Sequence, residues 1–279
     1  MRRRAAIRGV GVLIALMVPS VSMTDVVTVR HTEGDLHGFL ALKGSDGRLL
    51  ADGDLVQTVR GAEVTARMTF RFHDGPTYDE TVVFSQRRQF RLIRDRLVEK
   101  GPSFPQPLEM VIDVARGVVS ANYTDQGESK QETEHMQLPP DLSNGIISTV
   151  LKNADPKAPP KRLSLVVATP KPRLVALEIS VAGGDRFTTG GERRTATHFV
   201  LKPQIGGIKG LIAPLVGKQP PDGHVWTLTG NSPAFIRSEQ QFYVDGPLWR
   251  IELVAPQWPL DTVSLMVDST ACRDKRLSL

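Results

Sequence analysis

Apolar and polar side chains alternate strictly along several stretches of the chain. In residues 64–72 every second position is apolar, and threonines and arginines fill the positions between them. Alternation with a period of two is typical of a β-strand that buries one face. The same pattern returns at 175–181 and 249–253. The sequence therefore predicts a protein built mainly of β-strands.

Asp-Gly pairs separate many of the apolar runs, at positions 46–47, 52–53, 74–75, 222–223 and 245–246. Such pairs readily adopt the positive φ values that tight hairpin turns require. We therefore expect an antiparallel meander with one apolar face, with strands at 48–59, 62–73, 78–86, 89–98, 108–114 and 117–124. Further strands are expected at about 224–229, 234–244 and 248–254.

Helical spacing interrupts the strand pattern once, directly after Pro140. The spacing predicts an amphipathic helix at about 141–153, whose first turn Asp141 or Ser143 would cap. Its apolar stripe consists of Leu142, Ile146, Ile147, Val150 and Leu151. The fold class expected is mainly β: a strongly curved antiparallel sheet, either a half-barrel or a spiral, wrapped around this one central helix.

A second apolar segment lies at 205–216, where glycines and Pro214 weaken a long helix. We interpret it as a short helix or loop that either caps the core or forms a lid over a cavity. The lid residues would be Ile208, Leu211, Ile212 and Leu215.

The first residues are typical of a secretory signal peptide. Four arginines precede an apolar run at 10–18, and small residues follow at Ser20 and Ser22. The run is shorter than the roughly 18 residues of a membrane-spanning helix, so no transmembrane anchor is expected after cleavage. We predict a signal peptide at 1–22 and one curved-sheet domain at 23–279 with a polar C-terminal tail. The mature protein would be soluble and periplasmic.

Removal of the four signal-peptide arginines lowers the formal net charge from +5 to about +1. A nearly neutral protein lacks the field that collects phosphates, so we do not expect nucleic acid as a partner. The densest local charge is an anion patch candidate at Arg87, Arg88, Arg91 and Arg94. Its alternative interpretation is the solvated face of a strand.

Motifs of catalysis and metal binding are missing. The chain contains neither G-x-S-x-G nor S-x-x-K, and its six histidines form no H-E-x-x-H. Cys272 is the only cysteine, so no intrachain disulfide can form. We therefore expect no metal, no cofactor and no enzyme activity. The alternative is an envelope hydrolase, acting on esters or glycans, whose residues meet only in the fold.

This layout resembles the curved, incompletely closed barrels of the LolA/LolB lipoprotein-carrier type and related periplasmic proteins of uncharacterised families. The resemblance rests on long antiparallel strands, hairpins such as Phe72-His73-Asp74-Gly75, and a helix between two sets of strands. It implies a cavity that holds acyl chains. We expect the partner to be an apolar or lipid-like ligand or another envelope protein. The candidate cavity residues are Met68, Phe70, Phe72, Phe84, Phe90, Leu92, Ile147, Leu151, Trp226 and Trp249.

Overall fold

The computed structural model describes residues 26–75, 77–189, 192–204, 220–228 and 232–254. Within these ranges the chain forms 14 strands and one α-helix. The elements are β1 (Leu36–Lys43), β2 (Leu49–Arg60), β3 (Glu63–Phe72), β4 (Thr77–Gln86), β5 (Phe90–Lys100), β6 (Leu108–Asp113), β7 (Val118–Asp125), β8 (Glu128–His135), α1 (Ile147–Asn153), β9 (Arg162–Val167), β10 (Arg173–Thr189), β11 (Glu192–Gln204), β12 (Gly223–Leu228), β13 (Ala234–Gln241) and β14 (Leu248–Val254).

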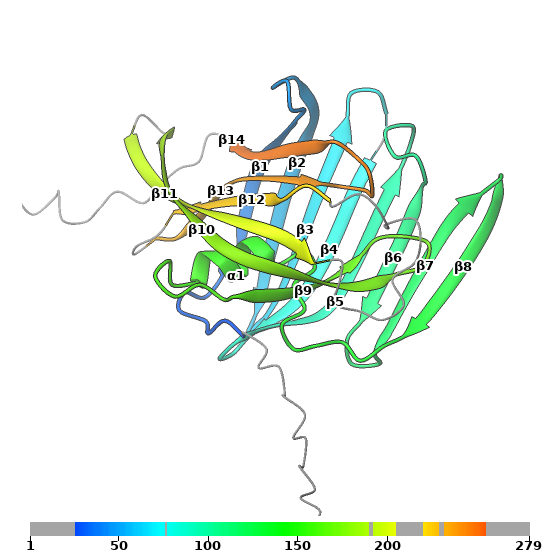
Figure 1. Ribbon diagram of the computed structural model, residues 1–279, viewed down its shortest axis with the longest axis horizontal. Helices are drawn as coiled ribbons and strands as arrows, with labels where there is room; N and C mark the ends of the chain where they lie inside the picture. Colours follow the sequence, from blue (N-terminus) through cyan, green and yellow to red (C-terminus); the bar gives the residue numbers. More distant parts are fainter. Residues whose placement is uncertain (1–25, 76, 190–191, 205–219, 229–231, 255–279) are drawn as a thin grey trace, which may run out of the picture.

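All 14 strands belong to one antiparallel sheet, in the order β8-β7-β6-β5-β4-β3-β2-β1-β14-β13-β12-β11-β10-β9. Strands that follow one another in sequence are paired, except β8 and β9. The one long-range pairing joins β1 to β14 and places Phe39 opposite Val254. This seam joins a first arm, β1–β8, to a second arm, β9–β14. The sheet is not closed, because β8 and β9 are its two edges. Figure 1 shows β2–β8 standing steeply while β10–β14 cross the view.

The expected meander is confirmed, since β2–β7 occupy the six predicted strand positions within a few residues. Three of the Asp-Gly pairs lie between strands, where Gly47, Gly75 and Asp245 have φ values of 80°, 100° and 59°. The prediction of a turn at Asp52-Gly53 was wrong, because both residues lie inside β2. Gly53 is needed there because a Cβ would overlap the ring of Phe70 on β3.

The helix begins later than predicted, at Ile147 rather than near residue 141, and it has no side-chain cap. Residues 141–144 instead add to the outer edge of β9. The backbone N–H of Ser143 donates to the carbonyl of Ser164 over 2.9 Å, and the N–H of Ser164 donates to the carbonyl of Asp141 over 3.3 Å. The predicted capping residues are thus used to extend the sheet.

Asn144 completes this edge pairing with its side chain. Its Nδ2 donates to the carbonyl of Val166 over 2.8 Å, and its Oδ1 accepts from the N–H of Val166 over 2.9 Å. The Asp141 carboxylate, expected at a helix N-terminus, accepts from the Ser164 hydroxyl over 3.0 Å. The edge of β9 is therefore hydrogen-bonded although no fifteenth strand covers it.

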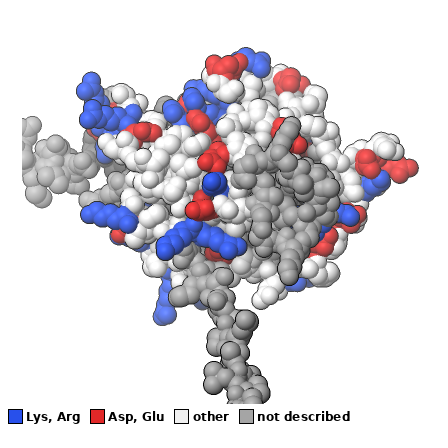
Figure 2. All heavy atoms as spheres, viewed as in Figure 1, with Lys and Arg blue, Asp and Glu red and all other residues white. Residues whose placement is uncertain are grey.

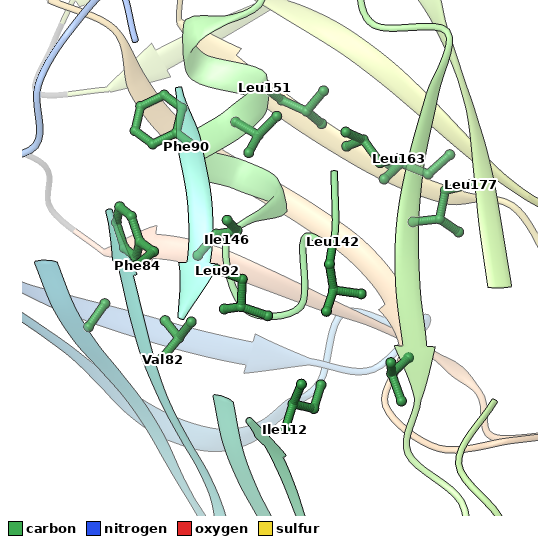
Figure 3. Close-up of a cluster of buried hydrophobic side chains, with 14 of the residues drawn as sticks. Val82, Phe84, Phe90, Leu92, Ile112, Leu142, Ile146, Leu151, Leu163 and Leu177 are labelled. Atoms are coloured by element: carbon green, nitrogen blue, oxygen red, sulfur yellow. The ribbon is translucent and has the colours of Figure 1, made fainter. Parts of the chain in front are cut away.

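Apolar side chains of both arms meet around the segment that carries α1. Figure 3 shows side chains of β4–β6 pointing towards side chains of the 142–151 segment and of β9 and β10. The shared core explains why the two arms stay together away from the seam, because separating them would expose this whole cluster to water. Its labelled members are Val82, Phe84, Phe90, Leu92, Ile112, Leu142, Ile146, Leu151, Leu163 and Leu177.

The end of α1 also holds the beginning of the described chain. Asn153, which is 1% exposed, accepts from the backbone N–H groups of Arg30 and His31 over 2.9 and 2.7 Å. Its Nδ2 donates to the carbonyl of Thr149 over 3.1 Å. Among the residues described here, no helix has the length and apolar character needed to cross a membrane.

Candidate functional site

A cavity of about 1140 Å³ lies among the two arms and α1. Every strand from β1 to β6 and from β9 to β14 contributes at least one side chain to its wall. The wall is mainly apolar, and its size is that of a small-molecule site. Representative apolar residues of the wall are Leu40, Leu55, Met68, Leu97, Met110, Ile147, Leu165, Leu177, Leu201, Val225, Phe235 and Ile251.

The ten predicted cavity residues separate into wall and core. Met68 and Ile147 line the cavity, and the other eight do not. Phe84, Phe90, Leu92 and Leu151 are buried in the core around α1. Phe70, Phe72 and Trp249 belong to a second cluster, in which aromatic rings pack against one another with centroids 4.9–6.1 Å apart. Strand alternation identified the buried face but not which buried side chains border the empty volume.

Trp226 lies in a third cluster. Its indole stacks on His198 with ring centroids 4.3 Å apart, and its Nε1 donates to the Asp185 carboxylate over 2.6 Å. The rings of His198 and His224 share a hydrogen bond of 3.0 Å. Burial and the neighbouring His224 lower the pKa of His198. This chain of an acid and two imidazoles is a site feature that the sequence pattern did not suggest.

The predicted lid, Ile208, Leu211, Ile212 and Leu215, lies outside the described residues. The four arginines of the anion patch candidate do not line the cavity. Arg87 and Arg88 are exposed in the turn before β5, and Arg94 is exposed on β5. Arg91 donates to the carbonyl of Pro140 over 2.8 Å and to the Gln89 side chain over 2.6 Å. On the face drawn in Figure 2, acidic and basic side chains lie side by side.

Four ionisable side chains lie together on the buried face of β4 and β5. Tyr78 and Glu80 alternate with outward residues on β4, and both line the cavity. Asp95 and Glu99 on β5 are 1% and 2% exposed. The register pairs Tyr78 with Glu99 and Val82 with Asp95. We call Tyr78, Glu80, Asp95 and Glu99 the acidic group.

A β-bulge places the two acids of β5 on this face. Between Val83 and Phe84 the register slips, so that these residues pair with Arg94 and Leu92 and leave Ile93 without an opposite residue. An extra residue in one strand reverses the side-chain alternation that follows it. Phe90 and Leu92 are buried before the bulge, and Asp95, Leu97 and Glu99 are buried after it.

The acidic group has few internal hydrogen bonds. The Tyr78 hydroxyl donates to Oε2 of Glu80 over 3.1 Å. Neither carboxylate oxygen of Asp95 has a partner, and Oε1 of Glu99 has none. Buried polar atoms without partners are rare in folded proteins, because each loses its hydrogen bonds to water without replacement.

Burial favours the protonated form of all three carboxyl groups. It raises the pKa of Glu80 to about 7, although the hydrogen bond from Tyr78 opposes part of the rise. Burial, helped by the nearby Glu80, raises the pKa of Glu99 to about 8 and that of Asp95 well above its usual value. Burial and these carboxylates also raise the pKa of Tyr78. Groups perturbed in this way beside a cavity are candidate functional residues.

Charges near the cavity are mainly acidic. Lys152 is the one lysine on the wall, the described wall contains no arginine, and Lys152 is paired with Glu33 over 2.8 Å. Glu239, also on the wall, accepts from Arg250 over 2.8 Å. Glu80 has no such cationic partner among its contacts. The wall therefore offers an acceptor for a positively charged or hydrogen-bond-donating group, and no free cation for an anion.

No protein-family model and no curated protein matches the chain. Two solved structures are similar in layout. A hypothetical lipoprotein, YmcC, from Escherichia coli has 9% identity and a TM-score of 0.34, covering 80% of this chain and 86% of its own. A beta-barrel-like protein of the domain of unknown function DUF1849 from Brucella abortus has 11% identity and a TM-score of 0.44, covering 81% of this chain and 100% of its own.

The chain itself is an open, mainly β protein with one sheet, one helix among its described residues and an internal cavity. At these identities and TM-scores no particular family or activity is assigned to it. Its function is argued below from its own residues.

Proposed function

We propose that the protein is a non-catalytic binding protein that holds an apolar, lipid-like molecule in the cavity between its curved sheet and α1. The observation that carries the proposal is the cavity of about 1140 Å³ with its mainly apolar wall. Burying one methylene group contributes about 0.8 kcal/mol, so a chain of ten would contribute roughly 8 kcal/mol before the costs of binding. An apolar wall attracts water weakly, which favours an apolar occupant.

The proposal has two further parts. The curved sheet and α1 together enclose the ligand, and the mature protein works in the periplasm. In a carrier of the LolA/LolB type, the ligand chamber lies between a curved sheet and helix, and here α1 packs beside the cavity. Residues 1–22 would direct export and be removed, so the mature protein would work in the periplasm with a ligand or partner of the envelope. Mass spectrometry of the mature N-terminus tests this part directly.

The cavity is tested with an apolar dye whose fluorescence rises in an apolar site, such as N-phenyl-1-naphthylamine. Saturable binding by the purified protein is expected. Met68→Trp would fill part of the cavity and weaken binding at least about tenfold, because the larger side chain occupies the ligand volume. Val56→Trp is the matched control, since Val56 is 43% exposed on the neighbouring strand β2.

Ile147→Trp repeats the test from the helix side, in case the substitution on β3 disturbs folding. Far-ultraviolet circular dichroism monitors the fold of each variant. Absence of saturable dye binding by the wild-type protein, or unchanged binding by both folded cavity variants, contradicts the proposal. If the dye binds and both cavity variants weaken its binding, native mass spectrometry of protein purified from its own envelope should identify a natural ligand.

A further inference from the structure

The position of Glu80 distinguishes it from the other acids of the cavity wall. It lies where the turn at Gly145 crosses the buried face of β4, and a Cβ on Gly145 would come within 3.2 Å of its Oε1. Its Oε2 already accepts from Tyr78. The wall residues opposite and beside it are Met68 and Leu97. A ligand that reaches Glu80 therefore meets one carboxyl group in an apolar surrounding.

Behind Glu80, the other two carboxyl groups of the acidic group are buried without a cationic partner. Asp95 is 1% exposed, and both of its carboxylate oxygens lack hydrogen-bond partners. Glu99 is 2% exposed with one such oxygen. A carboxyl in the interior is costly unless donors compensate it, and the backbone N–H of Arg96 offsets only part of the rise in the pKa of Asp95. Glu80 is the one carboxyl of the acidic group that lines the cavity, so a donor brought by a ligand would pair with Glu80.

We propose that the cavity binds a single-chain amphiphile with a primary ammonium head, and that the Glu80 carboxylate pairs with that head while the apolar wall holds the chain. The inference rests on the proposed function and specifies its ligand class. Asp95 and Glu99, which burial keeps largely protonated near neutral pH, lie behind Glu80 and supply no cation that would compete with the ammonium head. An anionic head is disfavoured, because the wall lysine, Lys152, is already paired with Glu33.

Pairing with an ammonium makes binding depend on pH with a defined sign. The titratable groups that face Glu80 are Tyr78 on its own strand and Asp95 and Glu99 on β5. From β3, β6 and the turn at 144–145 the wall receives Ala66, Met68, Met110, Asn144 and Gly145, none of which titrates. Because the pKa of Glu80 is about 7 in the free protein, its ionised fraction rises about tenfold from pH 6 to pH 8. The alkylamine stays protonated throughout, since its pKa is near that of lysine, about 10.

The experiment compares three probes with the same chain and different heads: dodecylamine, dodecanol and dodecanoate. Each displaces the apolar dye from the full-length mature protein, below its micelle concentration, at pH 6, 7 and 8. The amine is expected to bind about tenfold to a hundredfold more tightly than the alcohol at pH 8, as for one charged hydrogen bond. Its affinity should fall about tenfold at pH 6, whereas that of the alcohol should stay constant.

Glu80→Gln removes the charge and preserves the shape, so it should abolish the preference for the amine over dodecanol. Glu128→Gln, on the exposed strand β8, is the matched control and should behave as wild type. Equal binding of amine and alcohol by the wild type, tighter binding of dodecanoate, or a preserved preference in Glu80→Gln overturns the inference while the cavity proposal stands. If none of the probes nor the dye binds, the proposed function itself fails. The wild-type comparison of heads and pH needs no variant and is decisive even if Glu80→Gln does not fold.

Discussion

Replacing Glu99 with glutamine should change how the stability of the protein depends on pH. Glu99 is 2% exposed, and burial with the nearby Glu80 raises its pKa from 4.5 to about 8. The folded state therefore keeps a proton that the unfolded state releases above pH 4.5. Such a group contributes its full share to the stability of the fold below its unfolded pKa. That share of the stability is lost as the pH rises towards the folded pKa. Because glutamine does not titrate, the stability of Glu99→Gln should not fall with pH for this reason.

The size of the effect follows from the two pKa values. With 4.5 in the unfolded state and about 8 in the folded state, the wild type should lose roughly 2–3 kcal/mol relative to Glu99→Gln between pH 5 and pH 7. The difference should level off above pH 8. Burying the glutamine amide changes the free energy of unfolding of the variant by a constant amount, but a constant does not alter how the difference from wild type depends on pH.

Urea unfolding at pH 5, 6, 7 and 8 measures the difference, with the fluorescence of the buried Trp226 and Trp249 as the signal. Glu128→Gln, on an exposed strand, should show no change in slope. A wild-type-minus-variant difference that is flat from pH 5 to pH 8 would refute the reasoning, because it would mean that Glu99 keeps its ordinary pKa in the fold.

Three further substitutions test the packing around the cavity by urea unfolding. Asn153→Ala should lose about 1–3 kcal/mol and speed hydrogen exchange at Arg30 and His31, whose N–H groups it would leave without acceptors; unchanged exchange would contradict this role. Gly53→Ala should lose about 1–3 kcal/mol, because its Cβ would overlap the Phe70 ring, and a neutral result would mean that the ring moves freely. Phe199→Ala should lose about 3–5 kcal/mol, because Phe199 is 0% exposed in the core around α1, and a loss below about 1 kcal/mol would argue against that core.

The sequence predicted the sheet well where strand alternation and a tight turn together determine how two successive strands pair. Strict alternation over 64–72 fixes which face of β3 is buried, and positive-φ turns at Gly47 and Gly75 keep successive strands adjacent. The pairing of β1 with β14 was not predictable in this way, because no local rule relates residues about 210 positions apart. The same applies to the order of the second arm.

The start of the helix was misplaced because two physical solutions compete at Asp141 and Ser143. Both residues are good helix N-caps, and both also form hydrogen bonds with nearby backbone. The unpaired edge of β9 supplies partners for the backbone of this segment, at Ser164 and Val166. Which solution wins depends on a strand more than 20 residues away, and the local sequence does not contain that information.

The acidic group was missed for a related reason. On β4 the alternation of Tyr78, Glu80, Val82 and Phe84 could have shown that an acid occupies a buried position. On β5 the buried phase established by Phe90 and Leu92 assigns Asp95 and Glu99 to the solvent face unless the bulge near Ile93 is known. The available signals were Arg94 and Arg96, which an unbroken strand would place on the buried face with Phe90 and Leu92, and the apolar Leu97 on the opposite face.

The two edges of the open sheet bear on whether the protein stays monomeric. An unpaired strand invites pairing with another chain, which leads to aggregation. The β9 edge is occupied by residues 141–144, so the backbone donors and acceptors of Ser164 and Val166 are already used. Among the described strands, none pairs with the outer edge of β8, whose sequence, E-S-K-Q-E-T-E-H, is charged or polar at every position and mostly exposed. Pairing of β8 with the β8 strand of a second copy would bring like charges together and bury them. The charged edge therefore disfavours edge-to-edge association and the growth of fibres.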